Sequence, residues 1–177
     1  MITLSFTSKI EDPKAFEALF CDYFRIVVRL TEKVGMSGLS ADELAAKTMV
    51  NIDQALPPKG RLLAAKSDDG KLMGCGIISL IKPDAVEMRR VFVRPEAQGQ
   101  KLGLKIVQKL LTEAKSMGCT TLYADTVRGN TAMTNLCDFL GFEYIDRYPE
   151  NANPPEFAPY WLYMRRDLVE WEPPQPD

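Results

Sequence analysis

The feature that most restricts the fold is a strand that runs through a glycine-containing turn into an amphipathic helix. Residues 85–93 are largely apolar, Pro95 follows, and Gly99 and Gly103 flank the start of a helical pattern. Apolar residues then recur three and four positions apart, as on the buried face of a helix, at Leu102, Ile106, Val107, Leu110, Leu111 and Ala114. This pattern predicts the first strand and helix of a β-α-β-α-β series.

Helices are also predicted near the start of the chain. Asp12 followed by Pro13 is typical of a helix start, and helical spacing continues up to Gly35. Ser40 and Glu43 have capping-box spacing, so a second helix should begin there and stop before Pro57. No strand is assigned to this part of the chain.

The remaining pattern predicts a three-stranded antiparallel meander followed by alternating strands and helices. The expected strands are 61–66, 71–81, 85–93, 120–124, 142–145 and 160–164, with helices at 102–118 and 130–140. Residues 147–159 contain four prolines and are expected to form a surface loop. With 177 residues, one domain over 1–170 is expected, followed by a proline-rich flexible tail at 171–177.

Composition excludes several kinds of chemistry. The chain has no histidine, which removes the usual general base, Ser-His-Asp and Cys-His arrangements and imidazole metal sites. A net charge of −2 provides no field for nucleic acid, and no apolar run approaches the roughly 20 residues that cross a bilayer. Four scattered cysteines without C-x-x-C spacing favour a reducing, cytoplasmic setting. We therefore expect no metal site, no nucleic acid and no membrane partner.

The turn from Gln98 to Gly103 is a candidate anion site, because free backbone N–H groups and the positive helix dipole meet at a helix start. Glycine near a helix start is also common for structural reasons alone. The spacing does not fit a Walker loop, and Gly74-Cys75-Gly76 lacks the third glycine of a dinucleotide-binding fingerprint.

Two motifs resemble those of the GCN5-related N-acetyltransferase (GNAT) family. Val93, Pro95, Gln98 and Gly103 match the family's strand, turn and helix motif. At the expected distance, Asn130, Ala132-Met133 and Leu140-Gly141-Phe142 are similar to its second motif. The resemblance covers almost the whole chain. It implies a GNAT fold of the α/β (α+β) class, with a mixed sheet of about six to seven strands, antiparallel in its N-terminal half and flanked by four helices.

The resemblance implies acetyl-CoA as co-substrate. Backbone amides would hold its pyrophosphate, and one strand edge would pair with its pantetheine. The cofactor-binding residues it implies are Val91, Phe92, Val93, Gln98, Gly99, Gln100, Lys101, Leu102, Gly103, Asn130, Met133 and Cys137. Lys101 replaces a usual glycine, a change that an ordinary right-handed helical conformation would tolerate. Its ammonium either contacts a phosphate or remains solvated.

The reaction that the resemblance implies is direct attack of an amine on the thioester, with transfer of the acetyl group. Glu87 is the predicted proton acceptor, although a surface glutamate paired with Arg89 or Arg90 is the alternative. Ideal alternation would place Glu87, Arg89, Val91 and Val93 on one face, and a bulge would alter the count. The family's thiolate-side tyrosine is replaced by Cys137, which is expected to be core, and Tyr123 or Tyr160 could donate a proton instead.

The acceptor is expected to be a primary amine of a small molecule or peptide. Glu150, Glu156, Tyr160 and Trp161 are candidates for an acidic, aromatic receptor for its ammonium group, and a solvated loop without a ligand is the alternative. The resemblance also allows a homodimer and a longer acyl group. The departures at Lys101 and Cys137 leave a second function open, a catalytically weak acetyl-CoA-binding or regulatory module.

Overall fold

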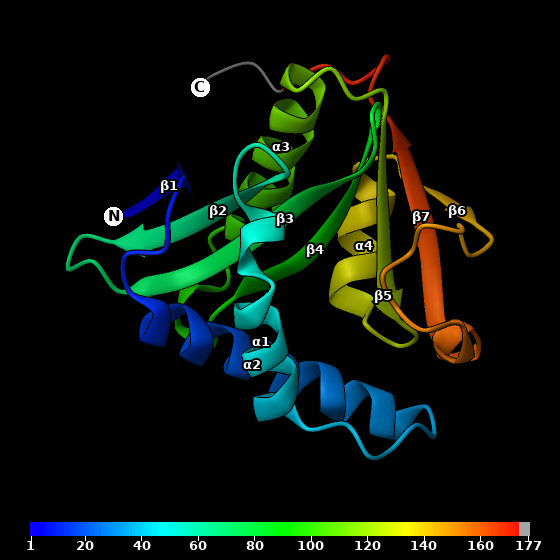
Figure 1. Cartoon of the computed structure of the whole chain (residues 1–177), viewed down its shortest axis with the longest axis horizontal. Helices are drawn as coiled ribbons and strands as arrows, with labels where there is room; N and C mark the ends of the chain where they lie inside the picture. The colour runs from blue at the N-terminus through cyan, green and yellow to red at the C-terminus, as the bar shows by residue number, and fades with distance from the viewer. Residues whose placement is uncertain (174–177) are drawn as a thin grey trace.

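A computed structural model describes residues 1–173, and residues 174–177 lie outside the described part. The chain forms a seven-stranded mixed sheet with the order β1-β2-β3-β4-β5-β7-β6, and helices cover both of its faces (Figure 1). The strands are β1 (Ile2–Thr7), β2 (Gly60–Ser67), β3 (Leu72–Lys82), β4 (Ala85–Val93), β5 (Thr121–Val127), β6 (Glu143–Ile145) and β7 (Trp161–Asp167). The α-helices are α1 (Pro13–Lys33), α2 (Ala41–Val50), α3 (Leu102–Ser116) and α4 (Thr131–Phe139). The predicted fold class is confirmed.

Both expected helix starts near the N-terminus are confirmed by their caps. The Asp12 side chain accepts a hydrogen bond from the Ala15 N–H, and Ser40 Oγ accepts one from the Glu43 N–H. Each cap satisfies a backbone donor that has no partner inside its helix. The apolar stripe of α1 buries Phe16, which packs with α2 against one face of the sheet.

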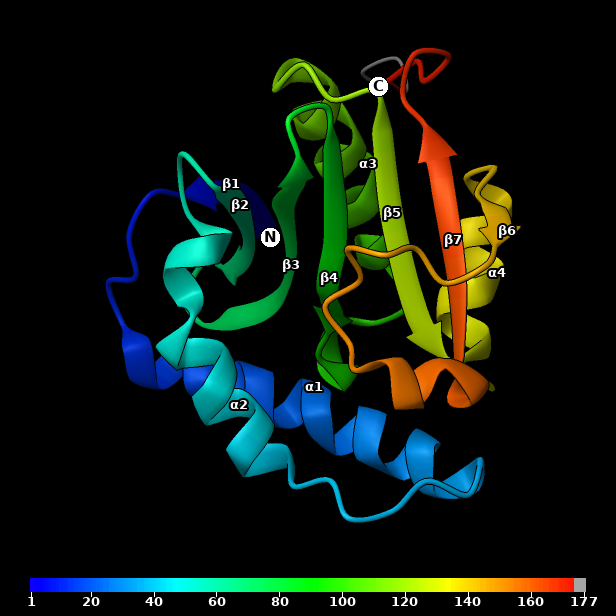
Figure 2. The same cartoon turned by 45° about the vertical axis from the view of Figure 1, so that its right-hand side comes forward.

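The two faces of the sheet carry separate cores. Helices α3 and α4 pack on one face around Ile106 and Leu110, whereas α1 and α2 pack on the other around Leu19 and Phe20. Figure 2 shows α3 and α4 behind the sheet and α1 and α2 at its front and lower edge. At the β5 and β7 end, α1 instead borders a third cluster that includes Trp161.

Strand β4 contains a bulge. Cys75 pairs with Phe92 and Ile77 with Arg89, so Arg90 and Val91 together face the single residue Gly76. The extra residue reverses the alternation of side chains along the strand. Glu87 and Arg89 therefore face away from the α3 side, while Val91 and Val93 pack against the core under α3. Ideal alternation, which would have placed all four on one face, does not hold.

Strands β4 and β5 separate after a short parallel pairing. The pairs run from Ala85 with Thr121 to Met88 with Ala124, and no later residue of either strand is paired with the other within residues 1–173. Figure 2 shows the two strands diverging toward their carboxyl ends. The last residues of each strand therefore border an opening in the sheet.

Two expectations about the chain ends need correction. β1 is a strand although none was expected there, and the period of two in Ile2, Leu4 and Phe6 was the available signal. Trp171, the first residue of the expected tail, is buried in the core under α3, and its carbonyl accepts a hydrogen bond from Lys115 Nζ. Its large apolar ring binds this residue to the domain despite the prolines that follow.

Candidate active site

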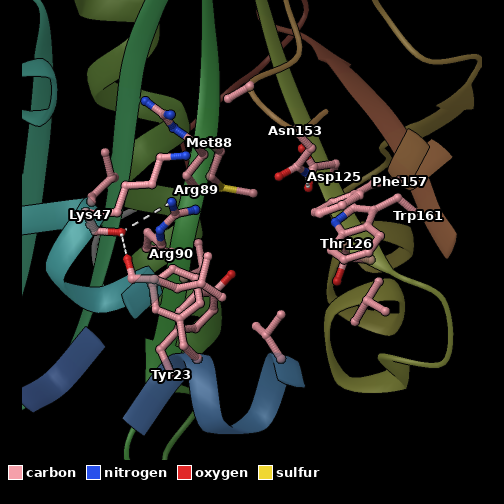
Figure 3. Close-up of a pocket in the computed structure, with 18 of the residues that line it drawn as sticks. Tyr23, Lys47, Met88, Arg89, Arg90, Asp125, Thr126, Asn153, Phe157 and Trp161 are labelled. Atoms are coloured by element: carbon pink, nitrogen blue, oxygen red, sulfur yellow. Dashed lines mark hydrogen bonds between the residues drawn. The ribbon is translucent and has the colours of Figure 1, made fainter. Parts of the chain in front are cut away.

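A cleft of about 590 Å³ opens where β4 and β5 separate. Its walls come from α1, α2, the two diverging strands, the start of α4 and the loop before β7 (Figure 3). The side chains that line the cleft include Tyr23, Phe24, Lys47, Thr48, Arg89, Arg90, Val91, Asp125, Asn130, Met133, Asn153, Phe157 and Trp161. Sequence reasoning placed Val91, Asn130, Met133 and Trp161 at a site but missed Asp125 and the basic residues.

The predicted anion turn presents a run of unpaired amides. The backbone N–H groups from Gly99 to Leu104 donate no hydrogen bond to any residue of the described chain. Gly99 has φ +82° and Lys101 has φ +55°, and left-handed residues of this kind turn successive N–H groups to one side to form an anion-binding concavity. The geometry therefore fits a phosphate or pyrophosphate.

Lys101 does not adopt the right-handed conformation in which the substitution would cost nothing. It is left-handed, with φ +55° and ψ +21°, and it precedes the first residue of α3. A side chain with a Cβ costs about 1 kcal/mol or more in this conformation relative to glycine. The turn keeps the left-handed backbone geometry that a glycine would favour, and the conformational cost falls on Lys101.

The other residues of the anion turn can offer their backbone amides to a ligand. Gln98 Nε2 donates to the Val93 carbonyl at 3.2 Å, which closes the turn onto β4. Leu102 is buried in the core under α3, so only its amide is available. Gly103 faces Leu136 of α4 and Val93, each near 4 Å from the place of a Cβ. Gln100 is exposed.

The two remaining residues of the β4 segment, Phe92 and Val93, differ in placement. Phe92 is buried against α1, with its ring 6.2 Å from that of Tyr23, and Val93 packs on the α3 side. Neither lines the cleft. A contact of Phe92 with a ligand on the α3 side would have to come from its backbone.

Glu87 is completely buried beneath the loop that follows β6, and it does not line the cleft. Its Oε1 accepts hydrogen bonds from the Tyr148 hydroxyl at 2.6 Å, Asn151 Nδ2 at 3.0 Å and the Ala152 N–H at 3.2 Å. Its Oε2 lies 3.4 Å from Arg89 Nε. The carboxylate thus anchors the loop and pairs with a cleft residue.

Asp125 is the carboxylate that reaches the cleft wall. Its Oδ2 accepts from Asn151 Nδ2 at 2.6 Å and its Oδ1 from Asn153 Nδ2 at 3.0 Å. Burial first, and then the negative charge of Glu87, raise the pKa of Asp125 to about 6. The available sequence signal was an acidic residue directly after the expected strand 120–124.

Three basic side chains, Lys47, Arg89 and Arg90, line the cleft against the single carboxylate Asp125. In Figure 3 the basic groups gather on the α2 and β4 side, and Asp125 lies across the cleft with Phe157 and Trp161. The Arg90 guanidinium carbon lies 4.9 Å from the centre of the Phe24 ring. This cleft is mainly cationic, contrary to the acidic receptor expected from the sequence.

The expected receptor residues are only partly assembled. Trp161 lines the cleft and stacks on Phe157 with ring centres 5.3 Å apart. Glu150 pairs with Lys82 at 3.0 Å, and Glu156 is exposed. Tyr160 packs beside the cluster around Trp161 and does not line the cleft.

Helix α4 contributes its first turn to the cleft. The Asn130 side chain caps the helix by accepting from the Met133 N–H, and its Nδ2 donates to Thr126 Oγ1 at 2.9 Å. One turn later, Cys137 is fully buried, and burial raises the pKa of its thiol to about 12. Cys137 is therefore a core residue at neutral pH, as was expected of a buried cysteine.

The described residues offer neither a metal site nor a membrane-spanning helix. No group of three or more cysteine and acidic side chains in residues 1–173 is arranged to hold a metal ion. In the same residues, no helix combines the length and apolar composition that crossing a bilayer requires.

The fold and the site place the chain in a class whose members transfer acyl groups. The family model described as "Acetyltransferase (GNAT) family" matches residues 15–142, and the chain belongs to this family. An N-acetyltransferase of Schizosaccharomyces pombe that is named as uncharacterized is 28% identical over 130 residues, which cover 68% of this chain and 77% of that protein.

Solved structures share the fold. An N-acetyltransferase of Thermoplasma acidophilum in complex with coenzyme A has a TM-score of 0.69 at 15% identity, covering 93% of this chain and 99% of that one. Spermidine N-acetyltransferase of Vibrio cholerae in complex with CoA and spermine has a TM-score of 0.63 at 15% identity, covering 94% and 96%. At these identities the likeness is one of fold.

Proposed function

We propose that this protein transfers the acetyl group of acetyl-CoA to a primary amine. One observation carries the proposal: the sheet opens between β4 and β5, with unpaired amides at the start of α3 and a cleft of about 590 Å³ at the opening. Family membership and the coenzyme A bound to relatives of the same fold support this use of the opening.

The residues that would hold acetyl-CoA follow from the placement of the amides. The backbone from Gln98 to Gly103 would receive the pyrophosphate, and the β4 edge at Val91 and Val93 would pair with pantetheine. Met133 lines the cleft beside this edge, and Asn130 fixes the turn that holds Met133. When bound, acetyl-CoA supplies an activated acyl carbon.

We propose Asp125 as the group that accepts the amine proton, directly or through water. A primary amine with an ordinary pKa near 10 arrives mostly protonated, so a proton acceptor on the cleft wall is required. Asp125 is on that wall, and its raised pKa of about 6 leaves it ionised but basic at pH 7. Glu87, the acceptor predicted from the sequence, remains the competing candidate, and in our proposal it positions the loop and tunes Asp125.

Three candidates for protonating the departing thiolate receive little support. Cys137 is buried with a high pKa, and both Tyr123 and Tyr160 lie outside the lining of the cleft. A CoA thiolate is a good leaving group, so the proposal requires no side-chain acid at this step.

A thiol-release assay over a panel of amines tests the proposed function. Acetyl-CoA should raise the melting temperature by mass action, and at least one amine should release CoA thiol and appear as its N-acetyl product. Binding without thiol release from any amine would instead support the acetyl-CoA-binding module. Absence of any thermal shift at millimolar acetyl-CoA would remove the cofactor from the proposal.

Four further properties are part of the proposal. We propose a single domain that extends one residue beyond the predicted boundary at 170, because Trp171 packs in its core, and that acts in the cytoplasm on small-molecule or peptide amines. The outer strands β1 and β6 each pair on one side only within the described sheet, so a homodimer through a strand edge is also proposed. Sedimentation of the full chain tests the homodimer.

A further inference from the structure

We infer that the acceptor is a primary amine that also carries a carboxylate, as an α-amino acid does. The inference rests on the proposed acetyl transfer and specifies the substrate class of the same cleft. It comes from the charges that face each other across the cleft, with Lys47, Arg89 and Arg90 on one side and Asp125 on the other.

Arg90 is the main reason to expect an anion. Its Nε is buried and has no hydrogen-bond partner within residues 1–173. Its Nη2 makes a long contact of 3.5 Å to Thr48 Oγ1, and its positive charge also acts on the Tyr23 hydroxyl and on Asp125 without a salt bridge to either within the described chain. Guanidinium groups bind carboxylates through two parallel hydrogen bonds, so an unpaired guanidinium on a cleft wall suits such a ligand.

The backbone holds this guanidinium in an unusual position. Arg90 lies in the β4 bulge with φ +56°, a conformation uncommon for residues other than glycine. Phe24 and Tyr23 pack against its guanidinium at 4.9 Å and 6.0 Å. Strained residues of this kind are often found at ligand sites, where the surrounding packing fixes them.

The other charged side chains of the cleft fit both ends of an amino acid. Arg89 forms a salt bridge with Glu87, whereas Lys47 is exposed, forms no salt bridge within the described chain and can face the carboxylate. Asp125 lies on the opposite wall and would face the ammonium group. A polyamine would place positive charges against three basic side chains, which disfavours that class.

The test compares each amino acid with its carboxamide and its decarboxylated amine, using thiol release by the full chain. Spermidine serves as the polycation. We expect KM for the amino acid to be about tenfold lower than for either matched amine, which is about 1.4 kcal/mol. Equal or better turnover of the carboxamide, the decarboxylated amine or spermidine would overturn the inference while leaving the acetyl transfer intact. Acetyl-CoA binding without turnover of any amine would overturn both.

Two variants test which side chains produce the preference for the amino acid over its decarboxylated amine. Arg90→Gln should raise KM for the amino acid about tenfold, leaving KM for the decarboxylated amine and for acetyl-CoA within twofold. Because Arg90 packs in a bulge, Lys47→Glu provides a second variant at an exposed position, and it should shift preference toward the decarboxylated amine. Lys109→Glu makes the same charge change on an exposed part of α3 outside the cleft and should leave preference unchanged. A loss confined to acetyl-CoA in Arg90→Gln would overturn the assignment.

Discussion

Replacing Glu87 by glutamine separates its two candidate roles. Asn151 Nδ2 donates to both Glu87 Oε1, at 3.0 Å, and Asp125 Oδ2, at 2.6 Å, so these oxygens are at most about 5.6 Å apart, the two lengths added. Two charges at this separation repel by about 3 kcal/mol at an effective dielectric constant of 20, and by about 0.7 kcal/mol in water. Glu87→Gln removes this repulsion and lowers the pKa of Asp125.

The expected result is a displaced acidic limb in the pH dependence of kcat/KM. Activity requires ionised Asp125, so the wild type should lose activity as pH falls through about 6. In Glu87→Gln the limb should remain but move about 0.5 to 2 pH units lower, because one pH unit corresponds to 1.36 kcal/mol. Asp125→Asn should remove the limb.

The variant will also be less stable, and this cost must be separated from the pH effect. Glutamine keeps an acceptor for Tyr148, Asn151 and Ala152 but turns an amide toward Arg89, leaving that charge without its partner. We expect a loss of about 2 kcal/mol, or about 4–8 °C in melting temperature. Glu113→Gln, which breaks a similar pair with Arg61 at 2.8 Å outside the cleft, should leave the pH profile unchanged.

Two outcomes would refute this reasoning. An unmoved limb in folded Glu87→Gln would mean that Asp125 is not the titrating group or that Glu87 does not influence it. Disappearance of the limb in Glu87→Gln, together with its persistence in Asp125→Asn, would make Glu87 the proton acceptor that the sequence predicts.

Three other substitutions test the anion turn, at Gly103 and Lys101, and the role of Cys137. Gly103→Asp should fold, since a Cβ there makes only ordinary contacts near 4 Å, and should weaken acetyl-CoA binding by at least about tenfold relative to the uncharged control Gly103→Asn; equal affinities by calorimetry would move the phosphate site elsewhere. Lys101→Gly should relieve the left-handed strain and raise the melting temperature of the free protein by about 2–4 °C, for about 1 kcal/mol, and a decrease would contradict the strain argument. Cys137→Ala should retain most activity while losing about 1 kcal/mol on denaturant unfolding, whereas a hundredfold loss of kcat in a folded variant would assign Cys137 a chemical role.

The elements that periodicity defines strongly were predictable. The apolar stripes of α1 and α3 and the caps at Asp12 and Ser40 are local signals that predict helices, and packing of the stripes on the sheet stabilises them. β1 is less predictable because six residues of alternation are a weak local signal and its pairing partner, β2, lies far away in the sequence. The burial of Trp171 is less predictable because it depends on a distant contact with the core under α3, whereas its neighbouring prolines favour an irregular segment.

The site was less predictable because it depends on long-range contacts. Asn151 joins Glu87 and Asp125 from a segment that was predicted as a surface loop with candidate receptor residues, and nothing in the local sequence indicated these two contacts. Glu150 was a reasonable receptor residue by composition, but its pairing with Lys82 takes it out of the cleft. Which acidic residue of a loop faces a ligand depends on the fold of that loop, and local sequence does not encode this directly.

The bulge explains how one strand can serve two ligands. Without the bulge, Glu87, Arg89, Val91 and Val93 would share a face. Their side chains could then contact either the coenzyme or the acceptor, but not both. The extra residue turns Val91 and Val93 toward the α3 side while Arg89 stays on the opposite face. Deleting Arg90 would remove the extra residue but leave Val91 and Val93 opposite Arg89, so coenzyme binding should persist while the preference for the amino acid is lost, an outcome that calorimetry and the amine panel can measure separately.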